Sequence, residues 1–197
     1  MKKILSILCL CFILPMNLNS AFEVVDPEMK AAMALAEKWI IVEQLSSAWY
    51  KLGKDIQRQA TIKIVMKLSW KNVPEACRGE FSDVDTTTWP CKYIEAALDA
   101  WYVAGNNTFR PFDSITMTEA MKLVLKAKWV EKTQETDSWQ EDYMETAYHY
   151  GIIDKKYYNF DDNATRGWIF QIATAVIEKE EEIKSIQDEM IMSNEVL

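Results

Sequence analysis

Apolar residues, with one threonine among them, return every three to four positions in three stretches of the chain. The spacing in each is i, i+3, i+4, i+7, which places these side chains on one face of an α-helix. The three sets are Thr61, Ile64, Val65 and Leu68; Ala120, Leu123, Val124 and Ala127; and Ile169, Ile172, Ala173 and Val176. Before the second set, Thr116-Met117-Thr118-Glu119 has the pattern of a capping box, so the middle helix is expected to begin at or beside Thr116.

Each of these helices belongs to a longer repeated unit. The residues before the second helix recur fifty positions later, where Trp89, Tyr93, Ile94 and Ala97 match Trp139, Tyr143, Met144 and Ala147. A partial first copy has Trp39-Ile40-Ile41 in the place of Trp101-Tyr102-Val103 and a helix over about 27–39. The units, at about 27–70, 80–131 and 137–179, each predict helix, irregular loop, helix. Because one helix pair cannot bury its apolar face alone, we expect one compact all-α domain over 22–179.

The two ends of the chain have different patterns. Lys2-Lys3, an apolar run from Ile4 to Leu14 and a polar stretch closing on Ser20-Ala21 predict a secretory signal peptide over 1–21, which is removed on export. Lipidation at a leader cysteine is the less favoured alternative. No later segment approaches the roughly 20 apolar residues of a membrane span, so none is expected in the mature chain.

Residues 180–197 predict a charged helical tail that continues the last helix. Its thin apolar stripe, Ile183, Ile186 and Met190, is more typical of a solvated helix end than of a coiled-coil partner.

Two cysteines, Cys77 and Cys91, lie beyond the leader. An even number in an exported protein predicts one disulfide. It would close a loop of about 15 residues and contribute about 3 kcal/mol. The alternative, a pair of metal ligands, is weaker because His149 is the only histidine and lies far away in sequence.

The charge balance restricts the function. Lysine and arginine number 22 against 30 acidic residues, a net charge of −8, and loss of Lys2 and Lys3 with the leader makes the mature chain more acidic still. Nucleic acid and anionic lipid are therefore disfavoured as partners.

With one histidine, no nucleophile elbow and no unpaired cysteine expected, we predict a protein that is not an enzyme and has no cofactor or metal. A glycosidase with a carboxylate pair is the enzyme class that remains open.

The middle unit resembles the S-layer homology domain, a bacterial repeat. The resemblance rests on Phe81-Ser82-Asp83-Val84, Trp89, Tyr93-Ile94-Glu95-Ala96-Ala97, Phe109-Arg110-Pro111 and Ile115-Thr116. The third unit is similar through Trp139, Ala147, Gly151-Ile152-Ile153, Phe160-Asp161 and Ala164-Thr165-Arg166, and the first through the segment 52–59. The resemblance implies three repeats in a pseudo-threefold bundle of helical prongs. It also implies grooves that bind a secondary cell-wall polysaccharide, often one with ketal-linked pyruvate.

The family motif Ile-Thr-Arg-Ala-Glu places an arginine in each groove. Arg58 and Arg166 hold that place here, but the middle unit has Met117, and Gly167-Trp168 replace the alanine and glutamate in the third. An arginine in the first turn of a helix suits a carboxylate, because free N–H groups and the helix dipole favour an anion. The alternative is a structural ion pair with one of the many acidic residues.

Two tryptophans, Trp101 and Trp168, are expected beside the groove ends, where sugar stacking and core packing are both open. Aspartates 83, 85, 161 and 162 fit turns and caps better than a calcium loop. The candidate glycan-binding residues are Arg58, Arg166, Gly167, Trp101 and Trp168. We predict an exported module that binds wall polysaccharide and anchors to the cell envelope. The alternative is a surface protein that assembles through contacts with other surface-layer proteins, without glycan.

Overall fold

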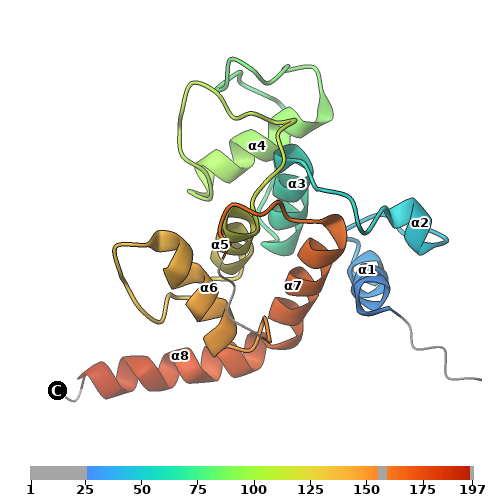
Figure 1. The fold of residues 1–197 in the computed structure, drawn as a ribbon. Helices are drawn as coiled ribbons and strands as arrows, with labels where there is room; N and C mark the ends of the chain where they lie inside the picture. Colours follow the sequence, from blue (N-terminus) through green and yellow to red (C-terminus); the bar gives the residue numbers. More distant parts are fainter. Residues whose placement is uncertain (1–25, 155–158, 196–197) are drawn as a thin grey trace, which may run out of the picture.

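The computed structural model describes residues 26–154 and 159–195, so the predicted signal peptide lies outside the described residues. Within them the fold is all-α, as predicted, with isolated backbone bridges in place of a sheet. The helices are α1 (Pro27–Glu37), α2 (Ser47–Tyr50), α3 (Arg58–Leu68), α4 (Trp89–Asp99), α5 (Met117–Ala127), α6 (Trp139–His149), α7 (Arg166–Glu178) and α8 (Glu180–Glu195) (Figure 1).

The predicted helix faces and start signals are present. All twelve residues of the three periodic sets are buried, on α3, α5 and α7. Thr116 caps α5: its hydroxyl accepts from the Glu119 N–H at 3.2 Å, and the Glu119 carboxylate accepts from the Thr116 N–H at 3.3 Å. The capping box therefore fixes the start of the middle helix as expected.

Helices pair across the predicted units more than within them. α1 packs on α7, α3 on α4 and α5 on α6, while α3 and α7 both contact α5 at the centre (Figure 1). The two helices of one unit thus belong to different pairs, and each unit is covered by its neighbours.

The loops before α3, α5 and α7 are joined in a closed ring of backbone hydrogen bonds. The Ile56 N–H donates to the Ala164 carbonyl at 3.0 Å, the Ala164 N–H to the Ile115 carbonyl at 2.9 Å, and the Ile115 N–H to the Ile56 carbonyl at 3.2 Å. All three residues are buried. Such a ring is what three similar units around one centre would form, although the pseudo-threefold symmetry and the count of three repeats stay predictions.

The C-terminal tail differs from its prediction. α7 ends at Glu178 and a new helix, α8, begins at Glu180, so the tail does not continue α7 (Figure 1). Ile183 is buried, and the Lys128 ammonium lies 2.7 Å from the Glu180 carboxylate. Its apolar stripe packs on the bundle while its charged residues stay exposed, so α8 is docked by one face and solvated on the other.

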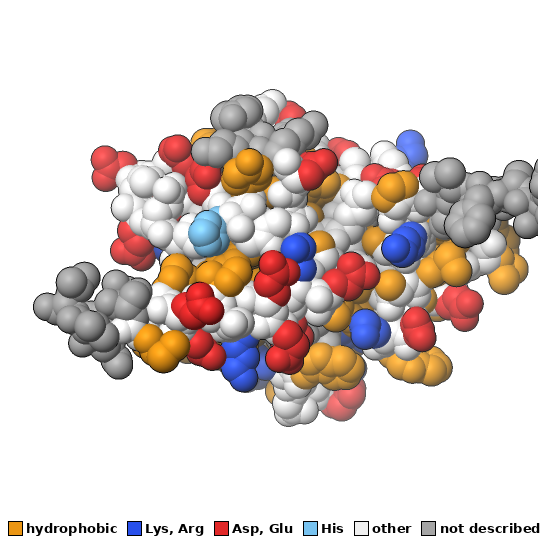
Figure 2. Space-filling view, turned by 90° about the horizontal axis from the view of Figure 1, so that it is seen from below, with side chains coloured by type: hydrophobic (Ala, Val, Ile, Leu, Met, Phe, Trp, Pro, Cys, Tyr) orange, Lys and Arg blue, Asp and Glu red, His pale blue; other side chains and the backbone are white. Residues whose placement is uncertain are grey.

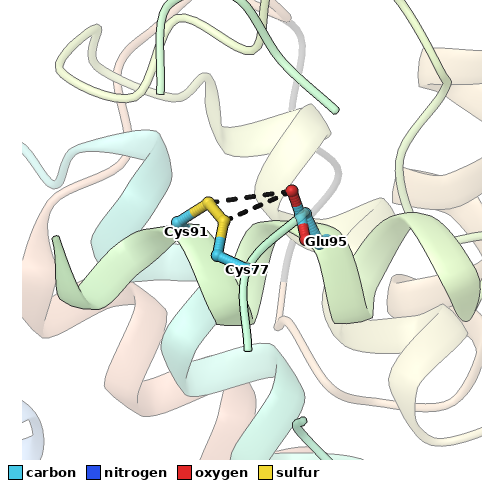
Figure 3. A group of neighbouring side chains, drawn as sticks. All are labelled: Cys77, Cys91 and Glu95. Atoms are coloured by element: carbon cyan, nitrogen blue, oxygen red, sulfur yellow. Dashed lines mark hydrogen bonds between the residues drawn. A yellow bond between two sulfur atoms is a disulfide. The ribbon is translucent and has the colours of Figure 1, made fainter. Parts of the chain in front are cut away.

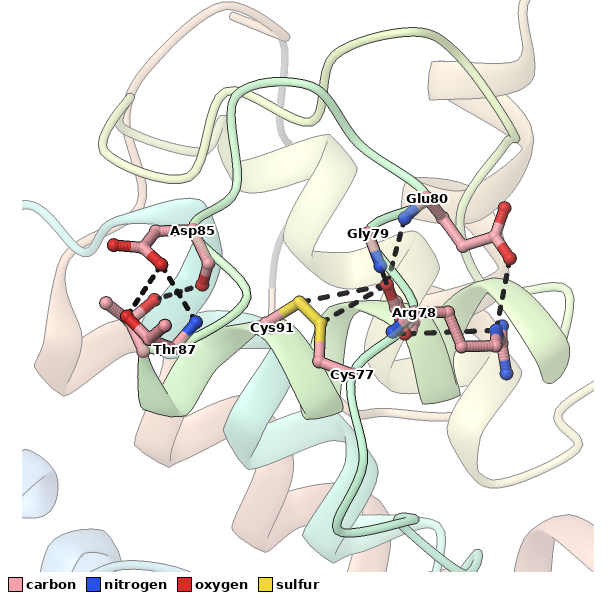
Figure 4. Close-up of a disulfide and its surroundings, with 9 residues drawn as sticks. Cys77, Arg78, Gly79, Glu80, Asp85, Thr87 and Cys91 are labelled. Carbon is pink, nitrogen blue, oxygen red and sulfur yellow. Dashed lines mark hydrogen bonds and ion pairs between the residues drawn. A yellow bond between two sulfur atoms is a disulfide. The ribbon is translucent and has the colours of Figure 1, made fainter.

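Cys77 and Cys91 form the predicted disulfide (Figures 3 and 4). Buried Glu95 lies beside it, with Oε1 3.3 Å from the Cys77 sulfur. The same carboxylate accepts the N–H groups of Arg78, Gly79 and Glu80 at 2.7, 2.7 and 3.0 Å. Although two sulfurs and a carboxylate come together here, the sulfurs are bonded to each other and the carboxylate is used by the backbone.

The predicted turn role is present at Asp85, which accepts the Thr87 N–H at 2.8 Å. Asp83 instead accepts the N–H groups of Phe109 and Arg110 at 2.8 and 2.7 Å, so it joins two loops that are distant in sequence. Over 26–154 and 159–195, no helix is both long and apolar enough to cross a bilayer.

Candidate functional site

Arg166 stands at the start of α7 and lines a groove of about 320 Å³. Its Nε donates to the Tyr50 carbonyl at 2.8 Å, and its guanidinium carbon lies 5.5 Å from the centre of the Phe170 ring. These contacts hold the side chain, and within residues 26–154 and 159–195 no acceptor is bonded to its two terminal nitrogens. Burial lowers the pKa of Arg166, yet the ordinary pKa of an arginine lies so far above neutral that the side chain stays charged at neutral pH.

The Arg166 groove is cationic. The described residues that line it include Lys63, Lys67 and Arg166 but no Asp or Glu. Burial lowers the pKa of Lys63, and the nearby positive charges of Lys67 and Lys92 lower it further. This crowding of like charge makes the groove an anion-binding environment on an acidic protein.

Aromatic rings border the same groove. Trp49 and Trp89 are both exposed and line it, and the Lys63 ammonium lies 4.9 Å from the centre of the Trp89 ring. A flat ring next to a cation can contact the C–H face of a sugar while the cation meets an acidic substituent.

Arg58, at the start of α3, lines a second groove of about 240 Å³. Its Nε donates to the Phe109 carbonyl at 3.1 Å, and its Nη1 lies 3.1 Å from Oε2 of Glu119. The arginine side chain is 16% exposed, so the ion pair is partly shielded from water. Glu119 thus neutralises Arg58, although the Lys122 ammonium beside Trp139 retains a positive charge in this groove.

The two grooves differ because of one residue in the following unit. Glu119 is the third residue of α5 and faces Arg58 from there. The third residue of α3 is Ala60, which lines the Arg166 groove and carries no charge. Within the described chain, no charged group perturbs the Arg166 guanidinium. The two arginines therefore stand in different electrostatic settings although they occupy the same position in their units.

The remaining predicted site residues lie elsewhere. Gly167 is buried under α1, where an added Cβ would come within 2.0 Å of a Glu28 carboxylate oxygen. Trp168 is half-buried against the core, and Trp101 is exposed at the end of α4. Neither tryptophan lines the groove of Arg58 or of Arg166. The structure thus places the two arginines in separate grooves and brings none of the five candidates together.

Sequence reasoning missed the lysines of both grooves. Lys63 and Lys122 each stand five residues after the first helical residue of α3 and α5, and each lies against a tryptophan that opens the next helix. This repeated spacing of a lysine five residues after the start of a helix was the signal in the sequence that could have identified them.

Comparison with known proteins identifies the middle unit. The sequence pattern of the S-layer homology domain matches residues 80–116, which run from the loop before α4 to the cap of α5. The middle unit is thus similar to an S-layer homology domain. Domains of this family are non-catalytic modules that anchor proteins to the cell wall.

Two larger proteins share a related region. The chain is 36% identical over 89 residues to the exoglucanase XynX of Acetivibrio thermocellus, covering 44% of this chain and 8% of that protein. It is also 36% identical over 89 residues to an amylopullulanase of Thermoanaerobacterium thermosulfurigenes, covering 44% of this chain and 5% of that one. The chain thus spans less than a tenth of the relatives that it matches.

Proposed function

We propose that this protein is an exported, non-catalytic module that holds the cell envelope by binding an anionic wall polysaccharide in the Arg166 groove. The observation that carries the proposal is the lining of this groove, which has three cations, two exposed tryptophans and no acid among its described residues. A wall polymer with carboxylates, such as ketal-linked pyruvate, has the complementary charge.

The proposed contacts follow from the geometry. A carboxylate of the polymer meets the terminal nitrogens of Arg166, which are held in place by the Nε bond to Tyr50, and the Lys63 ammonium adds a second positive charge. The sugar that carries the carboxylate packs on Trp89 or Trp49. The Arg166 guanidinium is already removed from water and held in one position before the ligand arrives. Binding of the polymer therefore costs little further side-chain entropy.

The same reasoning gives Arg58 a structural role. Its charge is matched by Glu119 and its Nε is bound to Phe109, so it joins α3 to the middle unit. An anion entering that groove would compete with the existing carboxylate.

Binding to polysaccharide released from isolated cell envelopes and fixed to a sensor surface tests the proposal. Arg166→Ala should weaken retention at least tenfold, about 1.4 kcal/mol, and rising salt should weaken the parent. Arg110→Ala is the matched control, because Arg110 is exposed, lies in the other groove and is 3.8 Å from Asp113. Retention of Arg166→Ala at the level of the parent, or an equal loss in Arg110→Ala, would contradict the proposal.

A second candidate function, assembly through protein contacts, has one observation in its favour. Met33, Val42 and Leu45 are exposed and line a wide hollow of about 1040 Å³ over α1 and the loop after it. Light scattering of the parent separates the two functions, since assembly requires a concentration-dependent increase in mass that Leu45→Ser reduces.

A further inference from the structure

Four helices end in a tryptophan with a left-handed backbone. Trp39, Trp70, Trp101 and Trp129 follow the last residues of α1, α3, α4 and α5 with φ of 60°, 55°, 61° and 57°. Glycine is the usual residue there, and α6 has Gly151 at φ 63°. Trp supplies four of the six described non-glycine residues with positive φ, although a side chain there costs about 1 kcal/mol.

Packing does not account for these four residues. Their exposures are 82%, 75%, 82% and 66% in chain order, so the indoles contribute little to the core. The chain thus places a large aromatic residue at each of four strained positions and leaves it in water. A large exposed side chain on a strained backbone is not explained by packing, and such a residue indicates a role in binding.

Contacts with lysines place the four tryptophans around the carboxyl ends of α3 and α5. Lys67, in the last turn of α3, donates to the Trp39 carbonyl at 2.8 Å, and Trp70 follows the same helix. The Lys71 ammonium lies 4.9 Å from the centre of the Trp129 ring, at the end of α5. Lys126, in the last turn of α5, donates to the Trp101 carbonyl at 2.5 Å. The contact of Lys71 with Trp129 brings the ends of α3 and α5 together, and we name these four tryptophans, which follow or contact the two ends, the tryptophan track.

Two of the four rings stand apart from other exposed apolar side chains. Trp70 lies between Ser69 and Lys71 in sequence, and the residue after Trp101 is buried. Trp39 differs, because it borders the hollow lined by Met33, Val42 and Leu45. One face of the protein, seen in Figure 2, likewise carries its hydrophobic side chains as separate groups among charged ones. Insertion into a bilayer or burial against a protein requires a continuous apolar area, whereas a single flat ring suits a sugar.

We infer that the tryptophan track is a second contact surface for the same anionic polysaccharide, an inference that rests on the proposed function. Sugar rings stack on the four indoles, and lysines 67, 71 and 126 supply positive charge near the carboxylates of the polymer on a chain whose net charge is −8. One long polymer that occupies both the Arg166 groove and the track is retained more strongly than by either alone, because the second contact is intramolecular.

The test uses the full chain and two double variants, Trp39→Ala with Trp101→Ala, and Trp70→Ala with Trp129→Ala. Binding is measured to polysaccharide released from envelopes and, separately, to vesicles of equal parts phosphatidylcholine and phosphatidylglycerol. We expect each double variant to lose at least about fivefold in polysaccharide binding, the size of two ordinary aromatic contacts. Phe112→Ala, which removes an exposed aromatic ring outside the track, should bind like the parent.

The outcomes separate the two proposals. If the parent binds polysaccharide through Arg166 and both double variants bind as well as the parent, the inference about the tryptophan track is wrong. The proposal for the Arg166 groove is then retained. If the parent does not bind polysaccharide, both proposals fail. Binding of the parent to vesicles that both double variants lose, with polysaccharide binding unchanged, assigns the track to a membrane and also overturns the inference. Replacement of the same tryptophans by glycine keeps the left-handed backbone, so loss of binding in those variants as well excludes a folding defect.

Discussion

Glu95 connects the disulfide segment to the body of the protein, and its replacement by glutamine tests that role. Glu95 Oε1 accepts the N–H groups of Gly79 and Glu80, and Oε2 accepts that of Arg78. The side chain is 3% exposed. Glu95→Gln keeps the volume but replaces one acceptor oxygen by a donor and removes the charge.

The expected cost follows from these three bonds. A glutamine oxygen can keep the Gly79 and Glu80 bonds, but its amide nitrogen then faces the Arg78 N–H and leaves that donor without a partner. A buried unsatisfied group costs about 1–3 kcal/mol, and the two remaining bonds weaken because the acceptor is neutral. We therefore expect a loss of about 2–3 kcal/mol, or about 5–10 °C in melting temperature for a chain of this size.

Thermal unfolding followed by far-ultraviolet circular dichroism measures this loss. Glu80→Gln is the control, because it removes an exposed ion pair with Arg78 and should cost less than about 0.5 kcal/mol. The comparison is repeated with the disulfide reduced. A Glu95→Gln melting temperature within about 2 °C of the parent in both states would refute the reasoning.

Three further predictions concern other parts of the fold. Burial alone would raise the pKa of Asp142, but hydrogen bonds from Thr136 and contact with Lys132 outweigh it and hold the pKa below its ordinary value, so this stabilisation is present above about pH 4 and is lost as the pH falls. Asp142→Asn should reduce the acid dependence of the melting temperature, and an unchanged pH profile would contradict this. Gly167→Ala should lower stability by about 1 kcal/mol by displacing the Glu28 carboxylate, and Glu28→Ala in the same chain should restore it, as urea titration would show. Trp101→Gly should raise stability by about 1 kcal/mol by relieving its backbone, whereas a lower urea midpoint would show that the indole stabilises the fold.

Local features of the fold followed from the sequence. The spacing of apolar residues predicted the buried faces of α3, α5 and α7, Thr116 and Glu119 predicted a helix start, and the cysteine pair predicted the disulfide. Each of these signals depends on residues close in sequence or on a simple count.

Features that depend on tertiary contacts could not be predicted from the sequence. Helical periodicity identifies which face is buried but not which helix covers it, so the pairing of α1 with α7 was not predicted. For the same reason the ion pair of Arg58 with Glu119 could be anticipated only as one of many alternatives. The tail was predicted to be a solvated helix end, and its charged residues are exposed, but the sequence did not show that Ile183 and its apolar stripe would dock on the bundle.

The cross-unit pairing of helices has a consequence for folding kinetics. α1 is the first described helix and α7 the last but one, yet they pack together, so this contact requires closure of a loop that contains the other two pairs. Contacts between residues so far apart in sequence form slowly. The pair of α3 with α4 and the pair of α5 with α6, which form earlier, would therefore persist as intermediates whose apolar faces are only partly covered. The segment 80–116 carries α4 but neither α3 nor α6, so it would not fold when transplanted alone. The smallest piece expected to fold by itself therefore runs from α1 to α7.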